Sequence, residues 1–109
     1  MVRLVLVLGL LAACSRDPTG GSVDGAKIFA QVCATCHGER GKPPEAMVAR
    51  LGVKDLTAPT LRAKITPEYV EKQVRSGSQN KLMPAFEQAF DDSQIKAIAA
   101  YVASPDFVK

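Results

Sequence analysis

The chain has 109 residues and a formal net charge of +3, and charged residues make up 23% of it. This length allows one small domain, which excludes a multidomain enzyme with a large substrate cleft and makes a stabilising cofactor, metal or disulfide useful. The mild, dispersed charge gives no support for nucleic-acid binding, and the apolar content argues against a disordered chain.

An export signal is predicted at the N-terminus. Arg3 precedes an apolar run at residues 4–11 and two alanines, which is the layout of a secretory signal peptide. As a helix, residues 1–13 would span about 20 Å, which is short of the roughly 30 Å hydrocarbon core of a bilayer. We therefore expect a signal peptide over residues 1–13 and no transmembrane span.

Cys14 follows this signal directly in the string Leu-Ala-Ala-Cys, which resembles the lipobox of bacterial lipoproteins. In such proteins the cysteine thiol carries diacylglycerol, and cleavage leaves that cysteine at the N-terminus; an ordinary signal with a chance cysteine is the alternative. Residues 14–23 hold few apolar side chains and several Gly and Pro breakers, so we expect a lipid-anchored flexible linker. The domain itself is expected over residues 24–109.

A first helix is expected from about Gly25 to Ala34. Asp24 can cap its first turn, and Gly25, Phe29 and Val32 follow a helical stripe. This helix would carry the next motif at its C-terminal end.

The string Cys33-Ala34-Thr35-Cys36-His37 is the attachment pattern of c-type haem. On a helix, two thiols three residues apart share one face, so each can add to a vinyl group of the porphyrin while His37 approaches the iron. A disulfide leaves His37 unexplained, a thioredoxin-like pair expects a βαβ pattern, and zinc needs four ligands. Haem attachment is therefore the preferred interpretation over these three.

The middle of the chain is expected to be mainly loop. Residues 38–64 are rich in Gly and Pro, with room for one short helix around residues 45–51. A second helix is predicted over residues 67–76, because Thr66 is a good N-cap and Gly77 is a natural stop.

The second axial ligand of the iron must be something other than histidine, because His37 is the only one in the chain. Met83 is preferred, since Pro84 biases it toward an extended backbone and stiffens the loop that presents it. Met47, a lysine or an empty position are the alternatives.

A last helix is predicted over residues 92–103. Asp91 and Gln94 can form a capping box, and an apolar stripe follows on one face.

Residues 24–104 resemble the class I, single-haem bacterial cytochromes c. The resemblance rests on the haem-attachment motif, on Met83-Pro84 and on the two terminal helices. It implies an all-α fold of three to five short helices wrapped around one covalently attached haem c. In that family Cys33 and Cys36 would hold the haem, and His37 and Met83 would bind its iron.

The same resemblance implies two contacts. The terminal helices would cross where Gly25 and Phe29 pack against Tyr101, because a missing Cβ permits close approach. A backbone carbonyl of Pro43 or Pro44 would accept the Nδ1 hydrogen of the iron-bound histidine and fix its ring.

These expectations favour a one-electron carrier and not an enzyme. An iron with both axial positions filled has no site for substrate, so the expected partners are an electron donor and an electron acceptor among membrane redox complexes. The expected location is the periplasmic or outer face of a bacterial membrane, with the lipid of Cys14 as anchor and the protein as a monomer. The alternative is a haem catalyst or a gas or peroxide sensor whose Met83 can be displaced. The polar side chains available for that role are Tyr69, Asn80 and Arg75.

Overall fold

The computed structural model describes residues 17–109, so the expected signal peptide and Cys14 lie outside the described residues. This part of the chain is built from helices without strands, which confirms the expected all-α class. No helix within it is both long and apolar enough to cross a bilayer. In chain order the elements are α1 (Gly25–Ile28), the π-helical turn η1 (Phe29–Cys33), α2 (Ala34–His37), α3 (Glu45–Leu51), α4 (Pro59–Arg62), α5 (Pro67–Ser76), α6 (Asp92–Ala103) and the 3₁₀ turn η2 (Pro105–Val108).

The first three elements form one continuous helical stretch that runs to His37, beyond the predicted end at Ala34. Asp24 caps it by accepting the N–H of Lys27 at 3.2 Å. In η1 the N–H of Ala34 donates to the carbonyl of Phe29, five residues back. Such a π turn inserts one extra residue into a helix and occurs most often at functional sites. Here it comes directly before the haem-attachment motif.

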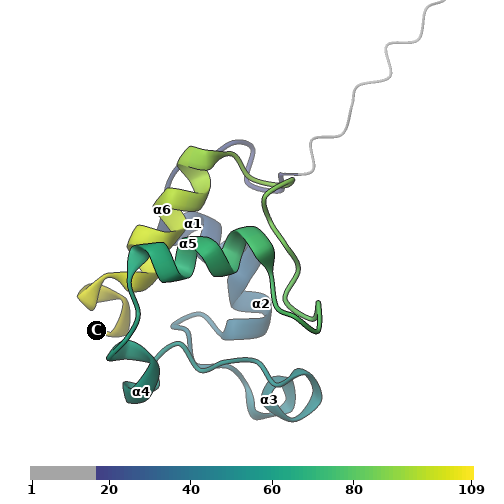
Figure 1. Cartoon of the computed structure of the whole chain (residues 1–109), viewed down its shortest axis with the longest axis vertical. Helices are drawn as coiled ribbons and strands as arrows, with labels where there is room; N and C mark the ends of the chain where they lie inside the picture. Colours follow the sequence, from purple (N-terminus) through teal and green to yellow (C-terminus); the bar gives the residue numbers. More distant parts are fainter. Residues whose placement is uncertain (1–16) are drawn as a thin grey trace, which may run out of the picture.

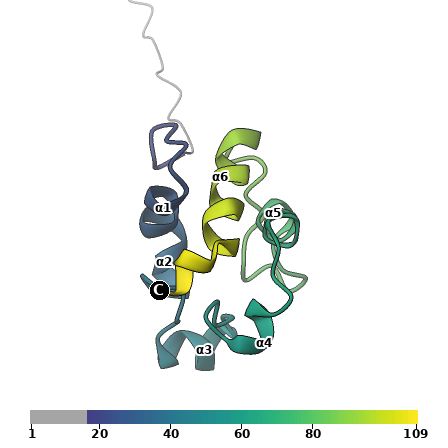
Figure 2. The same ribbon diagram turned by 90° about the vertical axis from the view of Figure 1, so that its left-hand side faces the viewer.

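The crossing of the terminal helices is confirmed, and Figure 2 shows α1 beside α6. A Cβ added at Gly25 would lie 2.1 Å from the carbonyl oxygen of Ala97 and 3.0 Å from the Cβ of Tyr101. The rings of Phe29 and Tyr101 meet edge to face with centroids 5.8 Å apart. Phe107, which sequence reasoning missed, completes the cluster at 5.3 Å from Phe29 and 5.2 Å from Tyr101.

The core lies where α5 and α6 pack against each other and against the first helical stretch. Figure 1 shows α5 crossing α6 in the upper part of the domain, with α3 and α4 at the end opposite the N-terminal segment. The buried core residues are Ile28, Phe29, Val70, Val74, Phe90, Ile95, Ile98, Ala99, Val102 and Phe107.

Arg62, in the unpredicted helix α4, fastens the C-terminal end of α6. Its guanidinium donates to the carbonyl of Val102 at 2.7 Å and to that of Ser104 at 2.9 Å. It also lies over the ring of Phe107, 5.4 Å from the centroid. These charge-assisted bonds satisfy carbonyls that a helix end leaves without partners.

The part of the expected linker over residues 14–23 that the structure describes, residues 17–23, contains a hydrogen-bonded turn. Asp17 accepts the N–H groups of Thr19 at 2.7 Å and Gly21 at 2.8 Å, and it accepts the side-chain amide of Gln94 at 2.7 Å. Asp commonly organises turns by bonding to backbone N–H groups that follow it. These bonds connect residues 17–22 to the first turn of α6, and the linker over residues 14–23 stays a prediction.

We expect Gly25→Ala to lower the free energy of unfolding by about 1–3 kcal/mol, the usual cost of overpacking a tight site. Alanine favours a helix by about 1 kcal/mol over glycine, but its Cβ meets a backbone carbonyl that cannot move aside alone. Guanidinium unfolding followed by circular dichroism measures the effect. Ala26→Ser, at an exposed position of the same helix, is the control, and equal stability of Gly25→Ala and the parent would contradict the proposed contact.

Candidate functional site

A hollow of about 910 Å³ opens between the end of α2, the segment after α3 and the loop after α5. Behind it lies an apolar recess of about 70 Å³ beneath α5. Cys33, Cys36, His37 and Met83 all line the hollow, whereas Met47 lines neither cavity. The structure therefore brings these four predicted haem-site residues, which are distant in sequence, to the same cavity.

The His37 imidazole is held by one backbone contact. Its Nδ1 lies 3.1 Å from the carbonyl oxygen of Lys54, and a carbonyl can only accept, so Nδ1 carries the hydrogen and Nε2 keeps its lone pair. Burial lowers the pKa of His37 below its usual value, and the Lys54 carbonyl opposes that shift. A neutral imidazole with a free Nε2 is the form that binds a metal.

The predicted partner of His37 was wrong, because the bond goes to Lys54 and not to Pro43 or Pro44. The carbonyl of Pro44 is already engaged, since it accepts the N–H of Met47 at 3.0 Å in the first turn of α3. The carbonyl of Lys54 comes from 17 residues beyond His37. No local pattern in the sequence signals a contact of that range.

Cys33 and Cys36 are free thiols, both half-buried, in the described part of the chain. Burial raises the pKa of Cys33 to about 11, and the neighbouring Cys36 adds to that shift. Among residues 17–109 no group of three or more His, Cys, Asp and Glu side chains gathers as a metal cluster would. The zinc, disulfide and thioredoxin-like alternatives thus find no support in the geometry.

Met83 stands on a loop fixed by backbone bonds. The N–H of Ser78 donates to the carbonyl of Met83, and the N–H of Met83 donates to the Ser78 hydroxyl oxygen, both at 3.0 Å. That hydroxyl donates to Asn80 at 2.6 Å, and Gln73 donates to the carbonyl of Gly77 at 2.9 Å. A stiffening role of Pro84 stays a prediction, and sequence reasoning missed Ser78 and Gln73.

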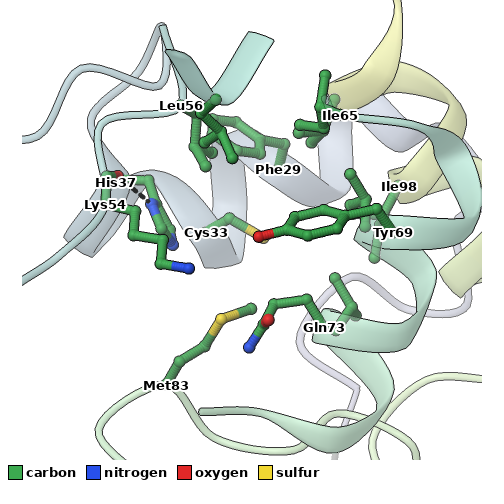
Figure 3. Close-up of a pocket in the computed structure, with 14 residues that line it drawn as sticks. Phe29, Cys33, His37, Lys54, Leu56, Ile65, Tyr69, Gln73, Met83 and Ile98 are labelled. Carbon is green, nitrogen blue, oxygen red and sulfur yellow. Dashed lines mark hydrogen bonds between the residues drawn. The ribbon is translucent and has the colours of Figure 1, made fainter. Parts of the chain in front are cut away.

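Figure 3 shows the residues that line the recess, with Met83 entering it from its loop and His37 and Cys33 on the facing side. Tyr69 and Gln73, one turn apart on α5, extend from that helix into the space. Arg75 does not line either cavity and instead bonds to Glu71 at 2.9 Å and to Asp92. Tyr69 therefore lines the recess together with the polar side chains of Gln73 and Lys54, Asn80 lines the hollow, and Arg75 lines neither.

The residues present fit a covalently attached haem. Two unpaired thiols, an imidazole with a free Nε2 and a thioether meet in a hollow whose volume lies near the upper end of the roughly 300–1,000 Å³ range of ligand pockets. The recess behind it is lined mainly by apolar side chains, which suits a macrocycle with a large apolar surface. Cysteine, histidine and methionine are the residues that bind c-type haem in proteins.

Comparison with known sequences agrees with this geometry. Residues 23–102 match the family described as cytochrome c oxidase, cbb3-type, subunit III. The cbb3-type cytochrome c oxidase subunit FixP of Bradyrhizobium diazoefficiens is 34% identical over 109 residues, which cover 94% of this chain and 34% of that protein. A cytochrome c6 of a Nostoc species is 34% identical over 102 residues, covering 94% of this chain and 86% of the relative.

Solved structures show the same likeness. The KustC0563 c-type cytochrome superposes with a TM-score of 0.67 at 29% sequence identity, covering 79% of this chain and 99% of the other. The chain thus spans about a third of the length of FixP, but it matches the c6 relative and this cytochrome over most of theirs.

Replacing Cys33 and Cys36 together by alanine should abolish covalent haem attachment, because no other thiol of residues 17–109 lines the hollow. Haem staining of the denatured protein and extraction with acidified acetone measure covalent retention. Cys14→Ser is the matched control, since it removes a cysteine upstream of the described domain and should leave haem attached. Haem that survives extraction in the double variant would disprove the assignment.

Proposed function

The chain belongs to the cytochrome c family and has one covalently bound haem c as its cofactor, and we propose that it carries single electrons between redox complexes of a bacterial membrane. The carrier would act on the periplasmic or outer face. We further propose that Cys33 and Cys36 hold the haem and that His37 and Met83 bind its iron.

The observation that carries this proposal is the presence of His37 and Met83 in the same hollow, on opposite sides. Bound haem c supplies a reversible one-electron exchange at its iron. The imidazole of His37, oriented by the Lys54 carbonyl, and the thioether of Met83 would both bind the iron. With both bound, the iron has no vacant position for a substrate, which favours electron transfer over catalysis.

Met83 is supported over the alternative ligands by its position. Met47 lies on α3 and lines neither cavity. Lys54 and Lys72 do line the hollow, but both are exposed at its edge. Soft thioether sulfur favours ferrous iron and raises the reduction potential relative to a second histidine, which suits a carrier to an oxidising partner.

The location and partners are supported by the N-terminal sequence and by one likeness. The predicted signal peptide and the lipobox-like string at Cys14 support export and a lipid anchor. FixP is named as a subunit of a cytochrome c oxidase, which supports a membrane redox complex as one partner of this chain. We propose that the protein acts as a monomer between such a partner and an electron donor.

Met83→Ala should remove the weak long-wavelength band of sulfur-bound ferric haem and lower the midpoint potential by about 0.1 V or more, within the roughly 0.8 V range over which axial ligands set haem potentials. Visible spectroscopy and redox titration measure both effects. Met47→Ala is the control and should leave the band and the potential in place. Tight carbon monoxide binding by the unaltered ferrous protein would instead favour the ligand-binding alternative.

Cys14→Ser should move the protein from the membrane to the soluble fraction without loss of haem, because the anchor and the haem use different cysteines. Fractionation and intact mass spectrometry of the membrane-bound parent measure this. A parent protein whose mass shows an unmodified Cys14 would contradict the anchor while leaving the carrier function standing.

A further inference from the structure

Residues 17–22 form a compact turn fastened to the first turn of α6. The Asp17 carboxylate accepts the N–H and the hydroxyl of Thr19 at 2.7 and 2.5 Å, the N–H of Gly21 at 2.8 Å, and the side-chain amide of Gln94 at 2.7 Å. The same amide nitrogen donates to the carbonyl of Ser22 at 2.9 Å. We call residues 17–22 together with Gln94 the N-terminal latch.

The buried side chain of Gln94 holds the latch against α6 by hydrogen bonds. Its side chain is 2% exposed, and its amide oxygen accepts the N–H of Asp91 at 3.0 Å while its nitrogen holds Asp17 and Ser22. Thr19 is also buried, at 8% exposed. A buried amide is costly unless its polar atoms are bonded, and opening the latch would remove both acceptors of the Gln94 amide nitrogen, Asp17 and Ser22.

The latch begins three residues after the proposed lipid anchor. Three extended residues span at most about 10 Å, whereas a free linker from residue 14 to residue 23 could span about 30 Å. An anchor on Cys14 would therefore hold the latch within about 10 Å of the lipid headgroups.

The surface around the latch carries mixed charges. Asp24 and Asp91 are exposed carboxylates, Lys27 is an exposed cation, and Asp92 pairs with Lys96 at 3.0 Å. These groups and Asp17 place four carboxylates against two cations, so this surface gains nothing from anionic lipid, which attracts clusters of basic residues. The short covalent connection, and not electrostatic attraction, would set the position of this end.

We infer that this end of the domain faces the lipid surface and that the haem hollow is thereby turned toward solvent, where a redox partner can reach it. Figure 1 shows the N-terminal turn at the end of the domain opposite α3 and α4, and the hollow is lined by the end of α2, the segment after α3 and the loop after α5. The inference rests on the proposed lipidation of Cys14 for its membrane part; the latch itself stands independently of it.

The latch is tested first without lipid, on the reduced, haem-loaded chain from residue 14 onward with Cys14→Ser. Backbone NMR order parameters for residues 17–22 should be near 0.85, as in rigid backbone, and should fall below about 0.6 in Asp17→Ala. Asp106→Ala, which removes another exposed carboxylate far from the latch, should leave them unchanged. Low order parameters in the Asp17 parent would overturn the latch.

Orientation is tested on the lipidated, reduced holoprotein in vesicles that contain a nickel-chelating lipid. A nitroxide at S93C, next to the latch, should relax much faster than one at A46C on α3, and Asp17→Ala should bring the two rates close together. Equal relaxation at both sites without Asp17→Ala would overturn the orientation. If the protein fails to bind vesicles because Cys14 carries no lipid, the anchor and the orientation fail together, and the NMR measurement still decides the latch.

Discussion

The close crossing of α1 and α6 is the contact on which the site depends. Because Gly25 has no Cβ, the backbone of α1 reaches the carbonyl of Ala97, and the rings of Phe29, Tyr101 and Phe107 close around the crossing. The helical stretch that starts at this point continues through η1 and α2 to the haem-attachment motif. Because α6 packs against both α1 and α5, the crossing of α1 and α6 sets the distance between α2, which ends at His37, and α5, which the Met83 loop follows.

The two proposed iron ligands, His37 and Met83, are held by hydrogen bonds that differ in sequence separation. His37 ends a helix, and a carbonyl 17 residues away fixes its ring. Met83 is held within its own loop by Ser78, five residues earlier. The contact of Lys54 connects the imidazole to a distant loop, whereas the bonds of Ser78 lie within the turn that follows α5.

Local signals were enough to predict much of the fold. The helices α5 and α6 begin and end as expected, because Thr66 and Asp91 act as caps that their neighbours in sequence reveal. The partner of His37 and the contacts of Arg62 and Asp17 could not be read in this way. Each joins residues far apart in the chain, such as Arg62 to Val102 and Asp17 to Gln94, and composition alone made the N-terminal turn resemble a free linker.

The Met83 loop and the helix that ends at His37 differ in how easily they open. Loops held by a few exposed bonds open at lower free energy than helices packed into a core. Ser78 and Met83 line the hollow on a loop, while His37 ends a helical stretch whose Phe29 and Ile28 are fully buried. We therefore expect the Met83 loop to open first, while His37, Cys33 and Cys36 stay in place. Loss of Met83 as an iron ligand would then be a local event and not the start of unfolding.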